Sequence, residues 1–230
     1  MTTDSPAIHM EQLRFAYKAG RDVLDIPSLH VPPREKVFLF GPSGSGKTTL
    51  LGVIAGVLEA QSGAVRVMGE DLRALSGARR DALRGARMGY IFQLFNLLPY
   101  LSVIDNITLP CRLHPARTAR LNGASPDSAA RDLAGQLDIA ELLREPAREL
   151  SVGQQQRVAA ARALMGNPEL VIADEPTSAL DHDHRAQFLE TLFQCCQRSG
   201  STLLFVSHDR SLEPMFDRAL SLPELQRRPA

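Results

Sequence analysis

The sequence predicts an α/β fold, in which a helical insert interrupts a core of strands and helices. Three observations favour it: alternating apolar residues near the N-terminus, an apolar run that leads through a glycine-rich turn into a helix, and helical signals over most of 95–165. The 230 residues are 44% hydrophobic and 23% charged, which suits one large globular domain. We expect a single domain over 1–230, with a core over about 1–92 and 166–230 and a helical subdomain over about 93–165.

The first part of the chain alternates between strand and helix signals. Period-2 apolar residues at its start predict a small antiparallel β subdomain. The next apolar run has no polar residue, so it is typical of a strand buried on both faces. The expected strands are Ile8–Tyr17, Val23–Val31, Val37–Phe40, Ala64–Met68 and Gly89–Phe92, and the expected helix is Thr48–Leu58.

The rest of the chain carries helix start and stop signals. Ser102 with Asp105 resembles a capping box, and Ser125 with Pro126 is a favourable N-cap and first-turn pair. Ser151 is the expected N-cap of a further helix. The expected later elements are the helix Val152–Met165, ended by Gly166, Asn167 and Pro168, the strand Leu170–Ala173, the helix His184–Gln197 and the strand Ser201–Val206.

Composition excludes several classes of protein. Basic and acidic residues balance, 26 against 26, so we expect no nucleic-acid partner, because phosphate backbones attract a surplus of Lys and Arg. No apolar run reaches the roughly 18–20 residues that a bilayer span needs, and no signal peptide is visible. Cys111, Cys195 and Cys196 lack zinc-type spacing, so we expect reduced thiols in a cytosol.

The strongest motif is GPSGSGKT at residues 41–48, between an expected strand and an expected helix. It matches the phosphate-binding loop, in which glycines let backbone N–H groups wrap a phosphate at a positive helix N-terminus. Lys47 would neutralise the β- and γ-phosphates, and the Thr48 hydroxyl would ligate Mg²⁺. The residues expected to contact nucleotide here are Gly41, Pro42, Ser43, Gly44, Ser45, Gly46, Lys47, Thr48 and Thr49.

A second motif is a pair of acids at the end of an apolar strand, Asp174 and Glu175. Successive side chains near a strand end point in different directions. Asp174 can therefore hold the magnesium shell while Glu175 faces an attacking water as general base. The alternative is two solvated acids that end a strand, and the phosphate loop makes it much the weaker interpretation.

A third motif is LSVGQQQR at residues 150–157, whose Gln154 stands 20 residues before Asp174. Together the three motifs resemble those of the ATP-binding-cassette (ABC) ATPases, from about Ile8 to Leu222. The resemblance implies a P-loop NTPase core of the ABC type, with ATP and Mg²⁺ as cofactors. It also assigns Gln93 to the glutamine loop, the segment Ser178–Asp181 to the D-loop, His208 to the switch histidine and Tyr17 to the aromatic that stacks on adenine.

The resemblance implies the remaining roles. Two copies of the chain would face head to tail, and Ser151, Gly153 and Gln154 of one copy would contact the γ-phosphate in the other. Asp181 would link the two sites. The resemblance further implies that Glu175, His208, Gln93 and Lys47 take part in ATP hydrolysis, and that Thr48, Gln93 and Asp174 surround Mg²⁺.

Two local features have alternatives. The ABC signature has two glycines after the serine, and Val152 replaces the first of them, which puts dimer closure and turnover in question. His182 and His184 flank Asp183 like a metal cluster, but the solvated face of a surface helix explains them better.

The segment 92–99, FQLFNLLP, with NITLP at 106–110 resembles the lipoprotein-release, macrolide-efflux and cell-division subgroup of the family. That resemblance implies a bacterial ATPase that powers a separate membrane permease by mechanotransmission, at the cytoplasmic side of the inner membrane. In the family, the apolar segment 94–101 docks the permease, although internal packing is an alternative interpretation. An importer ATPase and a soluble ABC ATPase remain as alternative functions.

Overall fold

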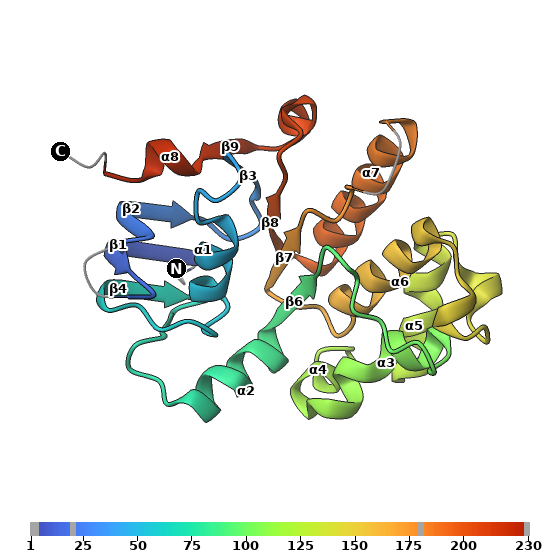
Figure 1. The fold of residues 1–230 in the computed structure, drawn as a ribbon. Helices are drawn as coiled ribbons and strands as arrows, with labels where there is room; N and C mark the ends of the chain where they lie inside the picture. Colours follow the sequence, from blue (N-terminus) through green and yellow to red (C-terminus); the bar gives the residue numbers. More distant parts are fainter. Residues whose placement is uncertain (1–4, 19–21, 179–181, 228–230) are drawn as a thin grey trace. The chain divides into compact units, whose positions relative to one another are not determined.

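The computed structural model describes residues 5–18, 22–178 and 182–227, and the chain divides into two compact units. The first unit comprises residues 1–84 and 202–230, and the second comprises residues 85–201. Both units contain helices and strands, as the predicted α/β fold requires (Figure 1). Among the described residues, no helix is both long enough and apolar enough to cross a membrane.

The first unit contains an antiparallel sheet of four strands and a group of three parallel strands. The antiparallel strands follow the order β2-β1-β4-β5, and β3 pairs with β8 on one side and β9 on the other. Its elements are β1 (Ile8–Phe15), β2 (Leu24–Val31), β3 (Lys36–Phe40), α1 (Lys47–Ile54), β4 (Ser62–Val67), β5 (Glu70–Asp71), β8 (Thr202–Val206), the 3₁₀ helix η3 (Arg210–Met215), β9 (Arg218–Ser221) and α8 (Leu222–Leu225).

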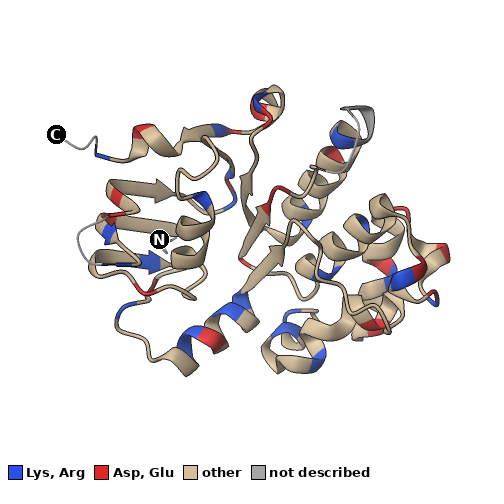
Figure 2. Ribbon diagram, in the orientation of Figure 1, with Lys and Arg blue, Asp and Glu red and all other residues tan. Residues whose placement is uncertain are grey.

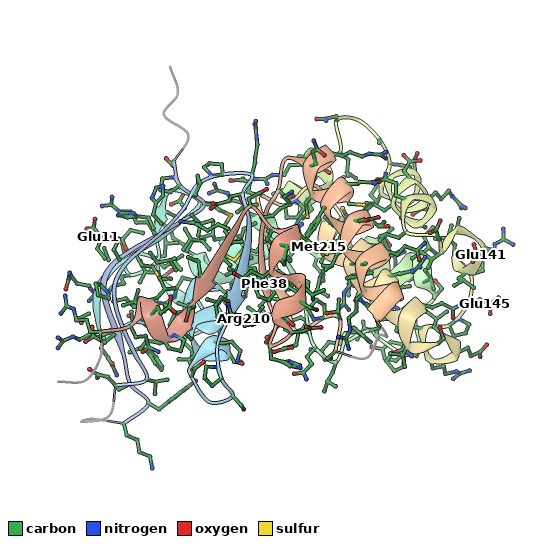
Figure 3. The ribbon with its side chains drawn as sticks, turned by 90° about the horizontal axis from the view of Figure 1, so that it is seen from above. Glu11, Phe38, Glu141, Glu145, Arg210 and Met215 are labelled. Carbon is green, nitrogen blue, oxygen red and sulfur yellow. The ribbon has the colours of Figure 1, made fainter. Side chains whose placement is uncertain are left out.

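Aromatic packing surrounds the middle of β3. Phe38, labelled in Figure 3, is fully buried and lies 6.3 Å from Phe205 and 5.2 Å from Phe216, between ring centroids. The Arg210 guanidinium lies 4.4 Å from the centre of the Phe40 ring, where a cation–π attraction operates. This core fixes the strand whose end carries the phosphate loop.

The second unit contains one pair of parallel strands and most of the helices. Its elements are β6 (Met88–Ile91), α3 (Val103–Leu113), α4 (Pro115–Ala119), α5 (Pro126–Gln136), η1 (Ala140–Leu142), η2 (Ala147–Glu149), α6 (Val152–Leu164), β7 (Leu170–Asp174) and α7 (His182–Ser199). Between β6 and the helices, Arg117 is 2% exposed and donates to the backbone carbonyls of Gly85, Met88 and Met165. These carbonyls satisfy a guanidinium that burial would otherwise destabilise.

The predicted strands and caps are present, with boundary shifts of a few residues. Helix α1 ends at Ile54, earlier than predicted, because Gly56 adopts a φ of 67° and Val57 donates to the Gly52 carbonyl. The left-handed glycine and the bond from Val57 back to Gly52 are features of a Schellman motif, which ends a helix. Strands β5 and β9 were not predicted, and neither was helix α2 (Gly77–Arg87).

Helix α2 buries only one residue, Leu83, and its other apolar residues are alanines. Four arginines lie along it, which Figure 2 shows in blue (Arg79, Arg80, Arg84 and Arg87). Ion pairs hold three of them, to Glu59, Asp81 and Glu169. Glu59 and Glu169 lie outside the helix, so two of these ion pairs are tertiary contacts that the sequence pattern alone does not reveal.

Candidate functional site

The glycine-rich loop connects β3 to α1 and exposes the N-terminus of that helix. Gly44 and Gly46 have φ angles of 78° and 99°, a region that other residues rarely adopt, and Gly46 is the N-cap of α1. No acidic residue occupies the first turn of α1, so its positive end is not neutralised from within the helix. The loop therefore has the geometry of an anion-binding site.

Lys47 closes the loop on itself. Its ammonium group donates to the Gly41 carbonyl at 2.8 Å and to the Pro42 carbonyl at 3.0 Å. The Ser45 amide also donates to the Pro42 carbonyl, at 3.2 Å. The charged end of Lys47 thus lies at the concave side of the loop, where a phosphate would meet it.

The two threonines after Lys47 differ in exposure. Thr48 is exposed, whereas Thr49 is 7% exposed and its hydroxyl lies 3.2 Å from the Tyr17 hydroxyl. The Tyr17 ring is packed edge-on against Phe15 at 5.0 Å, yet Tyr17 is 64% exposed. An exposed aromatic ring beside the phosphate loop is available to stack on a base, as the predicted adenine contact requires.

His208 belongs to the same unit as the phosphate loop. Parallel strands β3 and β8 pair Leu39 with Val206, so Gly41 and His208 both follow their strands at one carboxyl edge. The Ser207 amide donates to the Leu39 carbonyl at 3.2 Å, which continues this pairing. His208 is exposed there. Ligands of α/β proteins bind at this edge of the sheet.

The second unit brings Gln93 close to the two acids in the same way. Parallel strands β6 and β7 pair Ile91 with Ala173, so Gln93 and Asp174 lie at the carboxyl ends of neighbouring strands. Gln93 is exposed, and Asp174 and Glu175 are half-buried. Glu175 has a φ of 48°, an uncommon backbone conformation for a non-glycine residue that turns the chain sharply after β7.

Tyr90 is a residue of this edge that the motifs did not reveal. It stacks on Phe92 at 4.2 Å between ring centroids, and burial together with the negative charge of Asp174 raises its pKa well above the ordinary value. The phenol therefore stays neutral beside the acid. The signal that could have found it is the strand period, which places residues 90 and 92 on one face.

The signature residues lie at the start of α6. Ser151 is the N-cap, and its hydroxyl accepts from the Gln154 amide at 3.3 Å while the Gln154 side chain accepts from the Ser151 amide at 2.8 Å. This reciprocal pair is a capping box. Ser151 is exposed and Gly153 is half-exposed, so the helix N-terminus is accessible. Val152 is 50% exposed beside them.

The candidate residues are thus divided between the two units. The first unit contains Tyr17, residues 41–49 and His208, and the second contains Gln93, Ser151, Gly153, Gln154, Asp174 and Glu175. The predicted D-loop residue Asp181 lies outside the described residues. All three cysteines are free and buried.

The family profile described as ABC transporter matches residues 24–178 of the chain. This match covers more than half of the sequence and includes the phosphate loop, the signature and the two acids. The chain therefore belongs to the ABC transporter family, and it is an ATP-binding domain of that family. The recognition made from the motifs is confirmed.

Among named relatives, the lipoprotein-releasing system ATP-binding protein LolD of Novosphingobium aromaticivorans is 37% identical over 95% of this chain and 97% of its own. The macrolide export ATP-binding/permease protein MacB of Syntrophobacter fumaroxidans is 37% identical over 89% of this chain, which corresponds to 29% of that longer protein. An uncharacterised ABC transporter ATP-binding protein of Mycobacterium tuberculosis, Rv0986, is 37% identical over 94% of this chain and 87% of its own.

Solved structures confirm the predicted fold. The dimeric structure of MJ0796, a bacterial ABC transporter cassette, superimposes with a TM-score of 0.81 at 29% sequence identity, covering 93% of each chain. A dimeric post-hydrolysis state of the same cassette, bound to ADP and Pi, matches equally well. The chain thus has the P-loop ABC ATPase fold, the fold that binds ATP and ADP in that family.

Proposed function

We propose that this protein is the ATP-hydrolysing subunit of a bacterial ABC export complex, in which it powers a separate membrane permease by mechanotransmission. The observation that carries the proposal is the similarity to LolD over nearly the full length of both chains. A second relative, MacB, is named for macrolide export and joins a comparable domain to a permease. We place this protein at the cytoplasmic side of the inner membrane, where it would be held by the permease.

The phosphate loop would bind the triphosphate of ATP. Its glycines and the N-terminus of α1 favour an anion, and Lys47 would exchange its two loop carbonyls for phosphate oxygens. Tyr17 would stack on the adenine, since this residue is largely exposed and its hydroxyl lies beside Thr49 of the loop. The whole set from Gly41 to Thr49 would form the nucleotide contact.

Thr48, Gln93 and Asp174 would hold Mg²⁺. They supply a hydroxyl, an amide oxygen and a carboxylate, and magnesium prefers such oxygen ligands, so the donor set fits. When bound, the ion would neutralise the charge on the β- and γ-phosphates during transfer.

Glu175 would act as the general base, and His208 would orient the base and the γ-phosphate. The turn after β7 separates the directions of Asp174 and Glu175, which supports separate roles for them. Ser151, Gly153 and Gln154 would contact the γ-phosphate held by a second copy, with Asp181 linking the two sites. ATP would then hold two copies together, and hydrolysis would release them.

Replacing Glu175 with Gln tests this assignment. The amide cannot accept the proton of the attacking water, so the variant should lose at least about 100-fold in ATPase kcat. It should also accumulate as an ATP-bound dimer, which size-exclusion chromatography with and without ATP would detect.

Glu141, exposed on η1 and labelled in Figure 3, provides the control substitution Glu141→Gln, which should leave turnover and dimerisation unchanged. Normal hydrolysis by Glu175→Gln would overturn the role of the base. Absence of an ATP-dependent dimer would overturn the two-copy arrangement.

Purification of the tagged protein from its native membranes in mild detergent, followed by mass spectrometry, tests the task of the enzyme. A permease with about four membrane spans and a large extracytoplasmic domain is expected. A permease with more spans, recovered with a solute-binding protein, would instead indicate an importer. The absence of any membrane protein would indicate a soluble ABC ATPase.

A further inference from the structure

Residues 222–227, which we call the brace, follow β9 and belong to the same unit as the phosphate loop (Figure 1). Leu222, the first residue of α8, is fully buried. A methyl group on Gly41 would lie 3.2 Å from the Pro223 Cδ and 3.6 Å from the Leu222 Cβ. The brace therefore leaves little space beside the residue at which the loop begins.

The side chain of Gln226 connects the other end of the loop to strand β2. Its Nε2 donates to the Ser45 carbonyl at 3.1 Å, and its Oε1 accepts from the Asp25 amide at 3.4 Å. The Arg227 amide donates to the Asp25 carbonyl at 2.9 Å, which attaches the backbone of the brace to the same strand. Gln226 is half-buried, so water has restricted access to these bonds.

The bond to Ser45 fixes the direction of one peptide unit in the loop. In a planar trans peptide, the carbonyl of one residue and the N–H of the next residue point in opposite directions. A donor on the Ser45 carbonyl therefore turns the Gly46 N–H away from the brace. In the phosphate-loop motif, the backbone N–H groups are the ones that face the phosphates.

The local sequence alone does not hold this peptide unit. Glycine flanks Ser45 on both sides, and glycine adopts positive and negative φ angles about equally readily. Gly44 and Gly46 have φ angles of 78° and 99°. A bond from outside the loop is thus needed to keep one orientation, and Gln226 supplies it from a position 181 residues later in the chain.

Building on the proposed function, we propose that Gln226 is a positioning residue for the nucleotide site, which holds the Ser45–Gly46 peptide so that the Gly46 N–H stays turned toward the phosphates. Gln226 acts through the loop and not on the nucleotide itself. Its bond is made by a side chain, so a substitution removes it without altering the sequence of the loop.

Arg227 offers a matched control in the same segment. Its guanidinium donates to the Gln12 side chain, and its amide donates to Asp25, so both bonds reach the sheet and not the loop. Gln226→Met removes the donor to Ser45 and keeps an unbranched side chain of similar length. Arg227→Met removes the bond to Gln12 and keeps the backbone bond to Asp25.

The first measurement is amide hydrogen exchange on the protein without nucleotide. In Gln226→Met, peptides that cover residues 41–49 should exchange about fivefold faster, because the loop loses a tertiary bond. Gln226→Lys should restore part of the protection, since an ammonium group can still donate to the Ser45 carbonyl. Arg227→Met should leave these peptides unchanged, and equal exchange in all four proteins would overturn the role of Gln226.

The second measurement is calorimetric titration with ADP, together with steady-state ATPase kinetics. The Kd for ADP and the KM for ATP should each rise about fivefold in Gln226→Met, because a phosphate-binding N–H is no longer held in place. The kcat should stay within about twofold, since the lost interaction stabilises bound substrate and transition state alike. Gln226→Asn has the same amide on a shorter stem and should behave as Gln226→Met, whereas Arg227→Met should match the parent protein.

The outcomes separate this inference from the proposed function. If the parent protein binds ADP and Gln226→Met binds it equally well, the nucleotide site stands and the positioning role is overturned. A fall in kcat with an unchanged KM would also contradict that role. If the parent protein binds no ADP, the proposed function fails, and the role of Gln226 in nucleotide binding fails with it.

Discussion

At the scale of single residues, the signature departs from the family pattern at one position. Val152 is half-exposed at the first turn of α6, between the N-cap Ser151 and Gly153. A β-branched side chain there narrows access to the helix N-terminus, whereas glycine would leave it open.

We therefore expect Val152→Gly to raise the ATPase rate by a few-fold and to leave ATP affinity unchanged, because the phosphate loop carries that affinity. Steady-state kinetics and ATP titration of the free subunit would measure both. Val152→Ala separates the size of the side chain from the backbone freedom of glycine, and should give most of the increase. Identical rates in all three proteins would contradict the expectation.

Residue identity alone predicted several local contacts. Ser102, Ser125 and Ser151 each cap the helix that they were expected to begin, since a hydroxyl in that position satisfies an amide that the helix cannot. Arg162 was not predicted, because its partners are backbone carbonyls that lie 66 and 67 residues earlier in the chain. No residue type in the sequence marks such acceptors.

At the scale of elements, the caps of α5 and α6 form a matched pair. The Ser125 hydroxyl accepts from the Ser128 amide at 3.1 Å, and the Ser151 hydroxyl accepts from the Gln154 amide at 3.3 Å. Both bonds are exposed, and only Ser151 belongs to the proposed γ-phosphate contact.

We expect Ser125→Ala and Ser151→Ala each to lower the free energy of unfolding by about 1 kcal/mol, the usual cost of a lost cap. Urea denaturation would measure this. Only Ser151→Ala should also lower the ATPase rate, by about tenfold or more, because it removes a donor to the transferring phosphate. A comparable loss of activity in Ser125→Ala would show that stability, rather than phosphate contact, limits turnover.

The elements differ in how far their sequence predicts them. β3 and β7 were predicted because uninterrupted apolar residues bury both faces of a parallel strand. Helix α2 was missed because its arginines find their partners through tertiary ion pairs, and β9 because its four residues are all half-exposed.

At the scale of the whole molecule, Glu169 joins parts of the chain that are far apart in sequence. Its carboxylate accepts from Arg87 at 2.6 Å and from Arg120 at 2.5 Å. Arg87 is the last residue of α2, and Arg120 is the C-cap of α4. Burial opposes the charge, but bonds to Arg87 and Arg120 outweigh it, so the pKa of Glu169 is lowered.

A lowered carboxyl pKa stabilises the folded state above the ordinary glutamate value of 4.5, and this stabilisation is lost as the pH falls through the lowered pKa. We therefore expect Glu169→Gln to be less stable than the parent protein at neutral pH. The difference should shrink as the pH falls below 4.5. Urea denaturation at several pH values would measure it, and a difference that stays constant with pH would contradict the role of the charge.

The sequence by itself determined the ABC family, the phosphate loop, the two acids, the signature serine and most of the strands. These features depend on residues close together in the chain: glycines that permit a left-handed turn, acids that end a strand, and hydroxyls that cap a helix. Only the tertiary structure decided which carbonyls Arg117 and Arg162 bind, how Tyr90 meets the charge of Asp174, and why α2 is a helix. Their partners are backbone groups or charges distant in sequence, and a folded backbone is needed to bring such groups within hydrogen-bonding distance.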